Sequence, residues 1–209
     1  MEWILASASP RRKQLFAVLT DTFEILPAQG EEAVLAELSP KALAEALATQ
    51  KAEEVCARIE ERGVCKAILA ADTVVAQGGV VYGKPKDETD AFQMLAALSG
   101  KSHEVHTGVC VLYPYQKDGK CAYIKLSETA TTAVWFNRLD EAQIRKYIQS
   151  GSPMDKAGGY GIQDGDLVER IEGSFSNVVG LPLELCCRMM EQAKSLALQR
   201  GANRHTDSR

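Results

Sequence analysis

The chain has 209 residues, of which 45% are hydrophobic and 25% charged, and its formal net charge is -4. This length allows a sizeable core, and we expect one domain at 1–198, formed by two lobes around a cleft, before a polar, disordered tail at 199–209. The negative charge argues against nucleic-acid binding, because no basic stretch offsets it. No apolar run reaches the roughly 18 residues of a bilayer span, and no signal-peptide pattern opens the sequence. We therefore expect a cytoplasmic protein without membrane contact.

Cysteine spacing gives an expectation about the redox state. The sequence has no C-x-x-C pair, and Cys186 and Cys187 are adjacent, which suits a disulfide poorly. We expect reduced, mostly buried thiols that pack as small hydrophobes. The six are Cys56, Cys65, Cys110, Cys121, Cys186 and Cys187.

The first predicted element is a short apolar strand over residues 4–6, which leads into a helix start. Ser9 is a good N-cap and Pro10 suits the first helical position. The unpaired N–H groups of a helix N-terminus, with Arg11 and Arg12 beside them, can bind phosphate oxygens. The alternative is a capped surface helix whose arginines are only solvated.

A short strand at 23–26 and a loop at 27–32, ending in two acids, follow this helix. Apolar spacing then predicts a long amphipathic helix over 39–62, with Lys51 near its middle and Gly63 closing it.

Residues 67–71 predict a buried strand that ends on Asp72 and Thr73. Ligand-binding groups of α/β proteins gather at strand ends, which favours a functional role for Asp72. The alternative is that Asp72 merely caps a turn.

The next segment superficially matches a phosphate-binding P-loop, with Gly78 and Gly83-Lys84 at the required spacing. We reject this interpretation, because Pro85 stands where a Ser or Thr hydroxyl should meet Mg²⁺. Lys84 remains a candidate phosphate contact.

The remaining pattern alternates helices and strands, which predicts an α/β protein with a mixed, twisted sheet flanked by helices. The predicted elements are a helix at 87–100, a strand pair at 103–113 and 122–136 with a turn at Asp118-Gly119, a helix at 140–150, a strand at 168–171 and a helix at 181–198.

Two histidines, His103 and His106, resemble part of a zinc motif. They are three residues apart and would point to opposite faces of a strand, which argues against a shared metal ion. The sequence also offers no obvious Ser/His/Asp or Cys/His nucleophile.

The glycine-rich stretch 150–163 contains Asp155, Lys156, Tyr160 and Gln163. A flexible loop is the plain interpretation. The functional one is a backbone that approaches a ligand closely, with Gln163 reading a base edge. A glutamine amide donates and accepts at once, which suits the imide face of uracil or thymine.

Taken together, six motifs in this order resemble the Maf family of nucleoside triphosphate pyrophosphatases, over about residues 4–195. The motifs are Ser7-Ala8-Ser9-Pro10-Arg11-Arg12, Ala71-Asp72-Thr73-Val74-Val75, Gly83-Lys84-Pro85, His106-Thr107-Gly108-Val109, the stretch from Asp155 to Gln163, and Ser176-Asn177-Val178-Val179-Gly180-Leu181-Pro182. The resemblance implies an elongated α/β fold with a central cleft, related to inosine triphosphatases, often as a homodimer. It also implies hydrolysis of a nucleoside triphosphate to monophosphate and pyrophosphate with a divalent cation, Mg²⁺ or Mn²⁺.

The subgroup of this family that acts on dTTP and UTP carries the equivalents of Arg11, Thr73 and Gln163, so the resemblance implies that these three determine specificity. A sister subgroup specific for 7-methyl-GTP has tryptophan and glutamate at the first and last of these positions. Two departures from the family pattern are Ser152, in the place of a glutamate, and Glu31-Glu32 in place of Asp-Glu.

The resemblance further implies that Asp72 is the general base and that Glu32 and Asp72 hold the metal ion. An ordinary Asp is a weak base for bulk water, but a bound cation makes a water more acidic. The substrate-binding residues expected on this basis are Ser7, Arg11, Arg12, Lys51, Thr73, Lys84, Lys156 and Gln163.

Two alternatives stay open. One is a pyrophosphatase with a different base specificity, such as for non-standard purine triphosphates. The other is a nucleotide-binding regulator of cell division, since the family has such an association. A substrate panel distinguishes the first, and turnover that depends on Asp72 distinguishes the second.

Overall fold

The structure is a computed structural model that describes residues 2–30 and 38–202. The strands are β1 (Trp3–Leu5), β2 (Phe23–Ile25), β3 (Ala67–Gln77), β4 (Val80–Tyr82), β5 (Ser102–Lys117), β6 (Lys120–Phe136) and β7 (Val168–Glu172). The helices are α1 (Pro10–Leu19), α2 (Pro40–Glu60), α3 (Glu88–Leu98), α4 (Glu141–Gln149), α5 (Phe175–Val179) and α6 (Leu183–Ala202), with 3-10 turns η1 (Ser152–Asp155) and η2 (Ala157–Gly159).

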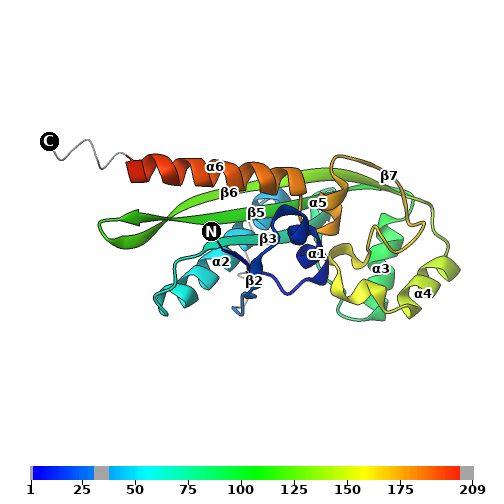
Figure 1. The fold of residues 1–209 in the computed structure, drawn as a ribbon. Helices are drawn as coiled ribbons and strands as arrows, with labels where there is room; N and C mark the ends of the chain where they lie inside the picture. Colours follow the sequence, from blue (N-terminus) through cyan, green and yellow to red (C-terminus); the bar gives the residue numbers. More distant parts are fainter. Residues whose placement is uncertain (1, 31–37, 203–209) are drawn as a thin grey trace.

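The strands form one mixed sheet in the order β2-β1-β3-β5-β6-β7, and β4 also pairs with β3. The first three strands of this order are parallel, and every other pairing is antiparallel. The long β5–β6 hairpin makes the molecule elongated (Figure 1). These features confirm the predicted α/β class with a mixed sheet.

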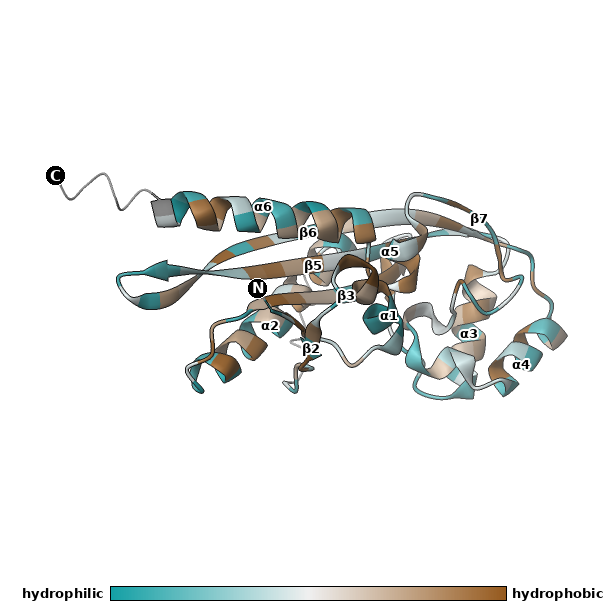
Figure 2. Cartoon of the chain, in the orientation of Figure 1, coloured by the Kyte–Doolittle hydropathy of each residue, from teal (hydrophilic) through white to brown (hydrophobic). Residues whose placement is uncertain are grey.

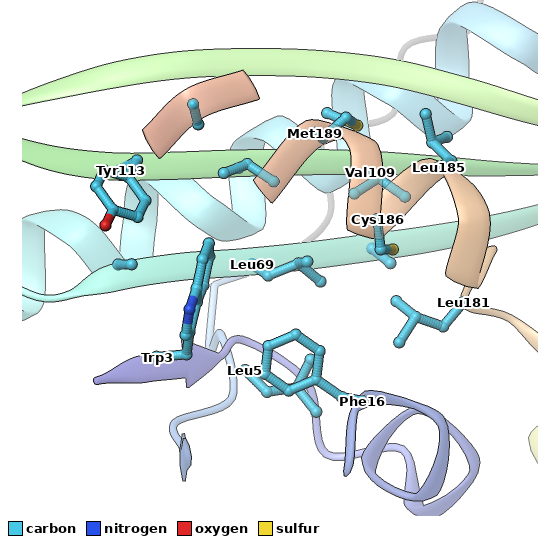
Figure 3. Close-up of a cluster of buried hydrophobic side chains, with 14 of the residues drawn as sticks. Trp3, Leu5, Phe16, Leu69, Val109, Tyr113, Leu181, Leu185, Cys186 and Met189 are labelled. Atoms are coloured by element: carbon cyan, nitrogen blue, oxygen red, sulfur yellow. The ribbon is translucent and has the colours of Figure 1, made fainter. Parts of the chain in front are cut away.

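Two helices cover the sheet, α2 on one face and α6 on the other (Figure 1). Alternate residues of β3 pack on opposite faces of the sheet, because successive strand side chains point in opposite directions. Ile68 and Ala70 pack in the cluster under α2, whereas Leu69 and Ala71 pack in the cluster under α6. Figure 3 shows the second cluster, where Leu69 lies among Trp3 and side chains of α1 and α6.

The hydropathy pattern explains this arrangement. The central part of β5 and most of β3 are hydrophobic, while α6 shows alternating hydrophobic and hydrophilic stripes (Figure 2). A helix with one apolar stripe buries that stripe and leaves the other side in water. A third buried cluster joins α3 and α4 to the end of β6, around Leu95, Phe136 and Ile144.

A close contact between α2 and the sheet occurs at Gly108, which lies directly opposite Asp72 in the β3–β5 register. A Cβ atom at Gly108 would lie 2.2 Å from the carbonyl oxygen of Ala44. Only glycine admits the helix backbone at this distance. The absence of a side chain here therefore sets how closely α2 approaches Asp72.

The N-cap predicted at Ser9 is confirmed, and other helices also begin with a capping residue. Ser9, Ser39, Asp87 and Asp140 each cap a helix through a side-chain oxygen, the last in a full capping box. The turn at Asp118-Gly119 joins β5 to β6 with positive φ at both residues.

Two boundary predictions are wrong. The strand through Asp72 does not end there: β3 continues to Gln77, because its later residues keep pairing with β5 and β4. The last helix begins at Leu183 and extends to Ala202, so residues 199–202 belong to it rather than to a tail, and 203–209 lie outside the described residues. The short helix α5 was not predicted.

The expectation that all cysteines are reduced is also wrong, because Cys65 and Cys121 form a disulfide. The β5–β6 hairpin brings Cys121 back over the connection between α2 and β3, so the two Cα atoms lie 6.2 Å apart despite 56 residues of separation. The other four are free, and only Cys187 of these is exposed. Burial raises the pKa of Cys56 to about 11 and that of Cys110 to about 12, which keeps both protonated near neutral pH.

No helix within residues 2–30 and 38–202 is long and apolar enough to span a bilayer.

Candidate active site

The site lies at a gap in the pairing of β3. Strand β1 pairs with β3 only as far as Leu69, and β4 begins to pair at Val75 on the same edge. Between these two points no described strand covers that edge, and a cavity of about 490 Å³ opens there, lined by Asp72, Thr73 and Val74 among others. A second hollow of about 390 Å³ adjoins it, lined by Ser7 and the start of α1. Asp72 therefore lies just beyond the point where the neighbouring strand β1 ends, although its own strand, β3, continues to Gln77.

Asp72 is 8% exposed and points to the α2 face of the sheet. Lys51 of α2 donates a hydrogen bond from Nζ to Asp72 Oδ1, and its side chain is 20% exposed. This contact depends on the close approach of α2 at Gly108 described above. The pair holds one carboxylate oxygen in a fixed direction at the mouth of the cavity.

Arg12 and Thr73 meet on the opposite side of β3. Arg12 Nη2 donates to Thr73 Oγ1 at 2.9 Å, and Arg12 Nε donates to the carbonyl oxygen of Gly180 at 2.8 Å. Both Arg12 and Gly180 line the larger cavity. The guanidinium is thus held by a strand and by the end of α5.

Lys156 takes a different position from the one expected for a substrate contact. Its side chain is 11% exposed, and Nζ donates to the Ser152 carbonyl oxygen at 2.5 Å and to Ser152 Oγ at 2.8 Å. The same ammonium pairs with Asp155 at 2.9 Å and with Asp164 at 3.4 Å. Lys156 lines the cavity, but its charge holds the glycine-rich loop together, with Ser152 at the centre of the network.

The two loop carboxylates are stabilised in their charged form. Burial raises the pKa of Asp155, but hydrogen bonds from Lys156 and Arg11 outweigh it and the net pKa is lowered. Burial also raises the pKa of Asp164, but the hydrogen bonds from Ser152 and other partners outweigh it, so the net pKa is lowered. Arg11 Nη1 donates to Asp155 Oδ2 at 2.9 Å, which ties α1 to the loop across the cavity.

Gln163 and Lys84 lie at the exposed rim of the larger cavity. Neither side chain has a hydrogen-bond partner within the described part of the chain. The turn that carries Lys84 is tied to the loop by a hydrogen bond from Gly158 N to the Gly83 carbonyl oxygen, at 2.9 Å. Both rim side chains can therefore meet a ligand without breaking an internal contact.

The two histidines have separate partners, as their opposite faces predicted. His103 Nε2 lies 2.7 Å from the Tyr160 hydroxyl, and burial lowers the pKa of His103 to about 4. His106 Nδ1 lies 2.9 Å from Thr131 Oγ1. His103 thus supports the loop residue Tyr160, which lines the cavity.

Glu32, an expected metal ligand, lies outside the described residues. One residue that the sequence did not indicate contacts the described loop before Glu32: Glu54 accepts hydrogen bonds from the backbone N–H groups of Gln29 and Gly30, at 2.8 and 2.9 Å. A glutamate on an amphipathic helix gives no sequence signal for such a role. Only the fold brings it to this loop.

The described residues fit a divalent cation in one limited way. Mg²⁺ often binds through one or two carboxylates together with substrate phosphate oxygens and waters. Asp72 supplies one buried carboxylate beside the cavity. Among residues 2–30 and 38–202 no three acidic, histidine or cysteine side chains form a cluster, so this part of the chain holds no complete cage.

Four cationic side chains and one buried carboxylate surround the two hollows. Arg11, Arg12, Lys51 and Lys84 line both of them. Fold and site together define an α/β protein with a cleft for a small polyanion. The chain belongs to the family of Maf-like proteins, whose model matches residues 2–193, and this confirms the resemblance seen in the motifs.

Similar proteins match nearly the whole chain. The "dTTP/UTP pyrophosphatase" of Carboxydothermus hydrogenoformans is 47% identical, over 92% of this chain and 98% of the relative. Proteins of the same name from Syntrophomonas wolfei subsp. wolfei and Thermococcus gammatolerans are 48% and 42% identical, over 86% and 90% of this chain and 90% and 95% of their own lengths. Among solved structures, the Staphylococcus aureus Ham1 protein matches with a TM-score of 0.48 and 12% identity, over 92% of this chain and 99% of that one.

Proposed function

We propose that this protein is a nucleoside triphosphate pyrophosphatase that hydrolyses dTTP and UTP to the monophosphate and pyrophosphate. The names of its relatives support this activity, because these relatives match almost end to end. The observation that carries the proposal is the position of Asp72: a buried carboxylate at the open edge of β3, paired with Lys51, beside a cavity that Arg11, Arg12 and Lys84 also line.

The cations and the start of α1 would bind the triphosphate. Arg12, Lys51 and Lys84 offset its negative charge, and the N-terminal end of α1 adds a helix dipole of the right sign. Ser7, 7% exposed in the smaller hollow, would hold a further phosphate oxygen. We assign the smaller hollow to the β and γ phosphates for this reason.

Asp72 would orient the attacking water and accept its proton. The water oxygen forms a bond to the α-phosphorus, and the bond between that phosphorus and the bridging oxygen of the leaving pyrophosphate breaks. Lys51 keeps the carboxylate directed and stabilises charge on the departing group. A divalent cation held by Asp72, and by Glu32 as the resemblance implies, would shield the phosphates and make the water more acidic.

The base would lie in the larger cavity, against apolar side chains such as Leu43, Val105 and Ile162. The exposed amide of Gln163 at its rim can pair with the imide edge of thymine or uracil, which offers one donor between two acceptors. Arg11 is engaged with Asp155, so we place it as a support of this rim as well as a specificity residue.

The test is pyrophosphate release from dTTP, UTP, CTP, dCTP, dITP and 7-methyl-GTP, with Mg²⁺ or Mn²⁺ and with a chelator. We expect turnover of dTTP and UTP, dependence on the cation, and loss of turnover in Asp72→Asn. A matched control is Asp140→Asn, which changes a carboxylate at the start of α4 and should leave the rate unchanged. Turnover of another base alone would overturn the specificity, and nucleotide binding without turnover would favour a regulator.

We also propose a homodimer, as the family resemblance implies, and a cytoplasmic location, as the sequence pattern led us to expect. Light scattering after gel filtration tests the first.

A further inference from the structure

A series of hydrogen bonds runs from Arg12 into the core through two threonine hydroxyls. Arg12 Nη2 donates to Thr73 Oγ1 at 2.9 Å, and Thr73 Oγ1 lies 3.0 Å from Thr107 Oγ1. Thr107 Oγ1 in turn lies 3.0 Å from the carbonyl oxygen of Asn177. Thr73 and Thr107 are direct partners in the β3–β5 register, so both side chains lie on one face of the sheet.

The direction of each hydrogen bond follows from the chemistry of the groups. A guanidinium only donates and a carbonyl oxygen only accepts, whereas a hydroxyl has one proton. Thr107 gives its proton to the Asn177 carbonyl, so it must accept from Thr73. The Thr73 hydroxyl therefore donates its hydrogen bond to Thr107 Oγ1 and accepts one from Arg12.

The inner end of this series is rigid. Asn177 is fully buried, and its Nδ2 donates to the Val105 carbonyl oxygen at 3.0 Å and to Thr132 Oγ1 at 2.9 Å. The same short helix presents Gly180, whose carbonyl oxygen accepts from Arg12 Nε. One element thus fixes Arg12 from two directions, directly at Gly180 and through the hydroxyls at Asn177.

Packing alone does not call for a hydroxyl at Thr107. The residue is 0% exposed in the middle of a strand, where valine has the same shape and suits the strand equally well. A buried hydroxyl costs free energy unless it is hydrogen-bonded, and here both its donor and its acceptor functions are used. The Thr107 hydroxyl is therefore needed for its hydrogen bonds and not for packing. These hydrogen bonds lead to Arg12, at the outer end of the series.

We propose that Thr107 is a positioning residue, which orients the Thr73 hydroxyl so that it holds Arg12 in place for the triphosphate. The proposal rests on the function proposed above. It also gives Thr73 a role other than contact with the nucleobase. The Thr73 hydroxyl donates to Thr107, so Thr73 affects the nucleotide through the position of Arg12.

A double-mutant cycle tests this proposal. Thr107→Val should lower kcat/KM for dTTP about ten-fold, the loss expected when one hydrogen bond to a charged group is removed. The same change in an Arg12→Gln background should have less than about a two-fold effect, since the group that Thr107 positions is gone. Equal losses in both backgrounds would overturn the proposal.

Two further variants separate positioning from stability. Thr107→Ser keeps the hydroxyl and should restore most of the activity. Thr129→Val removes another buried threonine hydroxyl, which lies within donating distance of the Lys41 carbonyl oxygen and of Glu45 Oε2 and is not part of the series to Arg12. It should lower the melting temperature and leave kcat/KM unchanged. If Thr107→Val does not fold, Thr73→Val tests the same link, and a cycle with Arg12→Gln that shows no coupling would overturn the proposal.

An NMR measurement distinguishes failure of this proposal from failure of the proposed function. The Arg12 Nη2–H resonance, assigned by its loss in Arg12→Lys, should exchange slowly with water in the wild type and in Thr107→Ser, because this group donates to Thr73 Oγ1. It should exchange faster in Thr107→Val. A wild type without turnover would refute the function while this readout still reports on the positioning, and unchanged exchange in Thr107→Val would refute the positioning.

Discussion

Lys51 of α2 and Asp72 of β3 are 21 residues apart in the sequence, and their side chains form an ion pair beside the cavity. The pair exists because α2 contacts the sheet where Gly108 lies opposite Asp72. The ion pair of the predicted base thus depends on a glycine that lines neither of the two hollows.

Replacing Lys51 tests the importance of this pair for the reaction. Lys51→Met should lower kcat for dTTP by at least about 100-fold, because both the fixed carboxylate and one phosphate partner are lost. Steady-state kinetics with Lys66→Met as control, a lysine far from the cavity that pairs with Glu2 and Glu24, checks this. Equal activity of the two variants would contradict the role of Lys51.

Gly108→Ala tests the close approach of α2. The added Cβ would lie 2.2 Å from the Ala44 carbonyl oxygen, so the helix must move, at a cost of about 1–3 kcal/mol in unfolding free energy. Activity should fall as well, since Lys51 moves with the helix. Urea unfolding is the measurement, and Gly201→Ala, where a Cβ meets nothing within 4 Å, is the control. A Gly108→Ala protein as stable as the control would contradict the packing argument.

Gln163→Glu tests base recognition. A carboxylate only accepts hydrogen bonds, whereas the imide edge offers both a donor and acceptors, so kcat/KM for dTTP and UTP should fall about ten-fold or more. Gln149→Glu adds the same charge at an exposed position at the end of α4 and should have no effect. An unchanged preference for dTTP in Gln163→Glu would show that the base is read elsewhere.

His103 should make stability depend on pH. Burial lowers its pKa to about 4 from the ordinary 6.5, so the unfolded chain binds a proton at a pH where the folded protein does not. The contribution is complete above pH 6.5 and is lost as the pH falls toward about 4, by up to ~3 kcal/mol. Urea unfolding at several pH values should show a smaller fall in His103→Gln, and equal slopes would contradict the assignment.

Reduction of the Cys65–Cys121 disulfide should lower the free energy of unfolding by about 2–4 kcal/mol, because the bond closes a long loop in the unfolded chain. Thermal melts of the wild type with and without reductant, beside Cys65→Ser, measure this. The variant should match the reduced wild type, and a melting temperature insensitive to reductant would contradict the effect.

Local chemistry made much of the fold predictable. The cap at Ser9, the helix start at residue 87 and the turn at Asp118-Gly119 are short-range signals, and each appears where the sequence placed it. Asp72 was chosen as the candidate base for a partly wrong reason, because its own strand continues and it is β1 that ends beside it. Strand pairing between distant segments decides this, and no local pattern records it.

The site residues divide in the same way. Arg12, Lys51 and Lys84 were expected to contact the same phosphates, and all three line one cavity. The direction of a long side chain was not predictable: the ammonium group of Lys156 points back into its own loop, where it donates to Ser152. The link from Arg12 to Thr107 joins residues 95 positions apart, so it became visible only once β3 and β5 were paired.

The most direct test of the account is hydrolysis of dTTP in water enriched in heavy oxygen, with wild type and Asp72→Asn side by side. Attack of water on the α-phosphorus predicts that the label enters the monophosphate and not the pyrophosphate, and that Asp72→Asn forms neither product at a measurable rate. Label in the pyrophosphate, or labelled monophosphate formed at the wild-type rate by Asp72→Asn, would contradict the proposed mechanism.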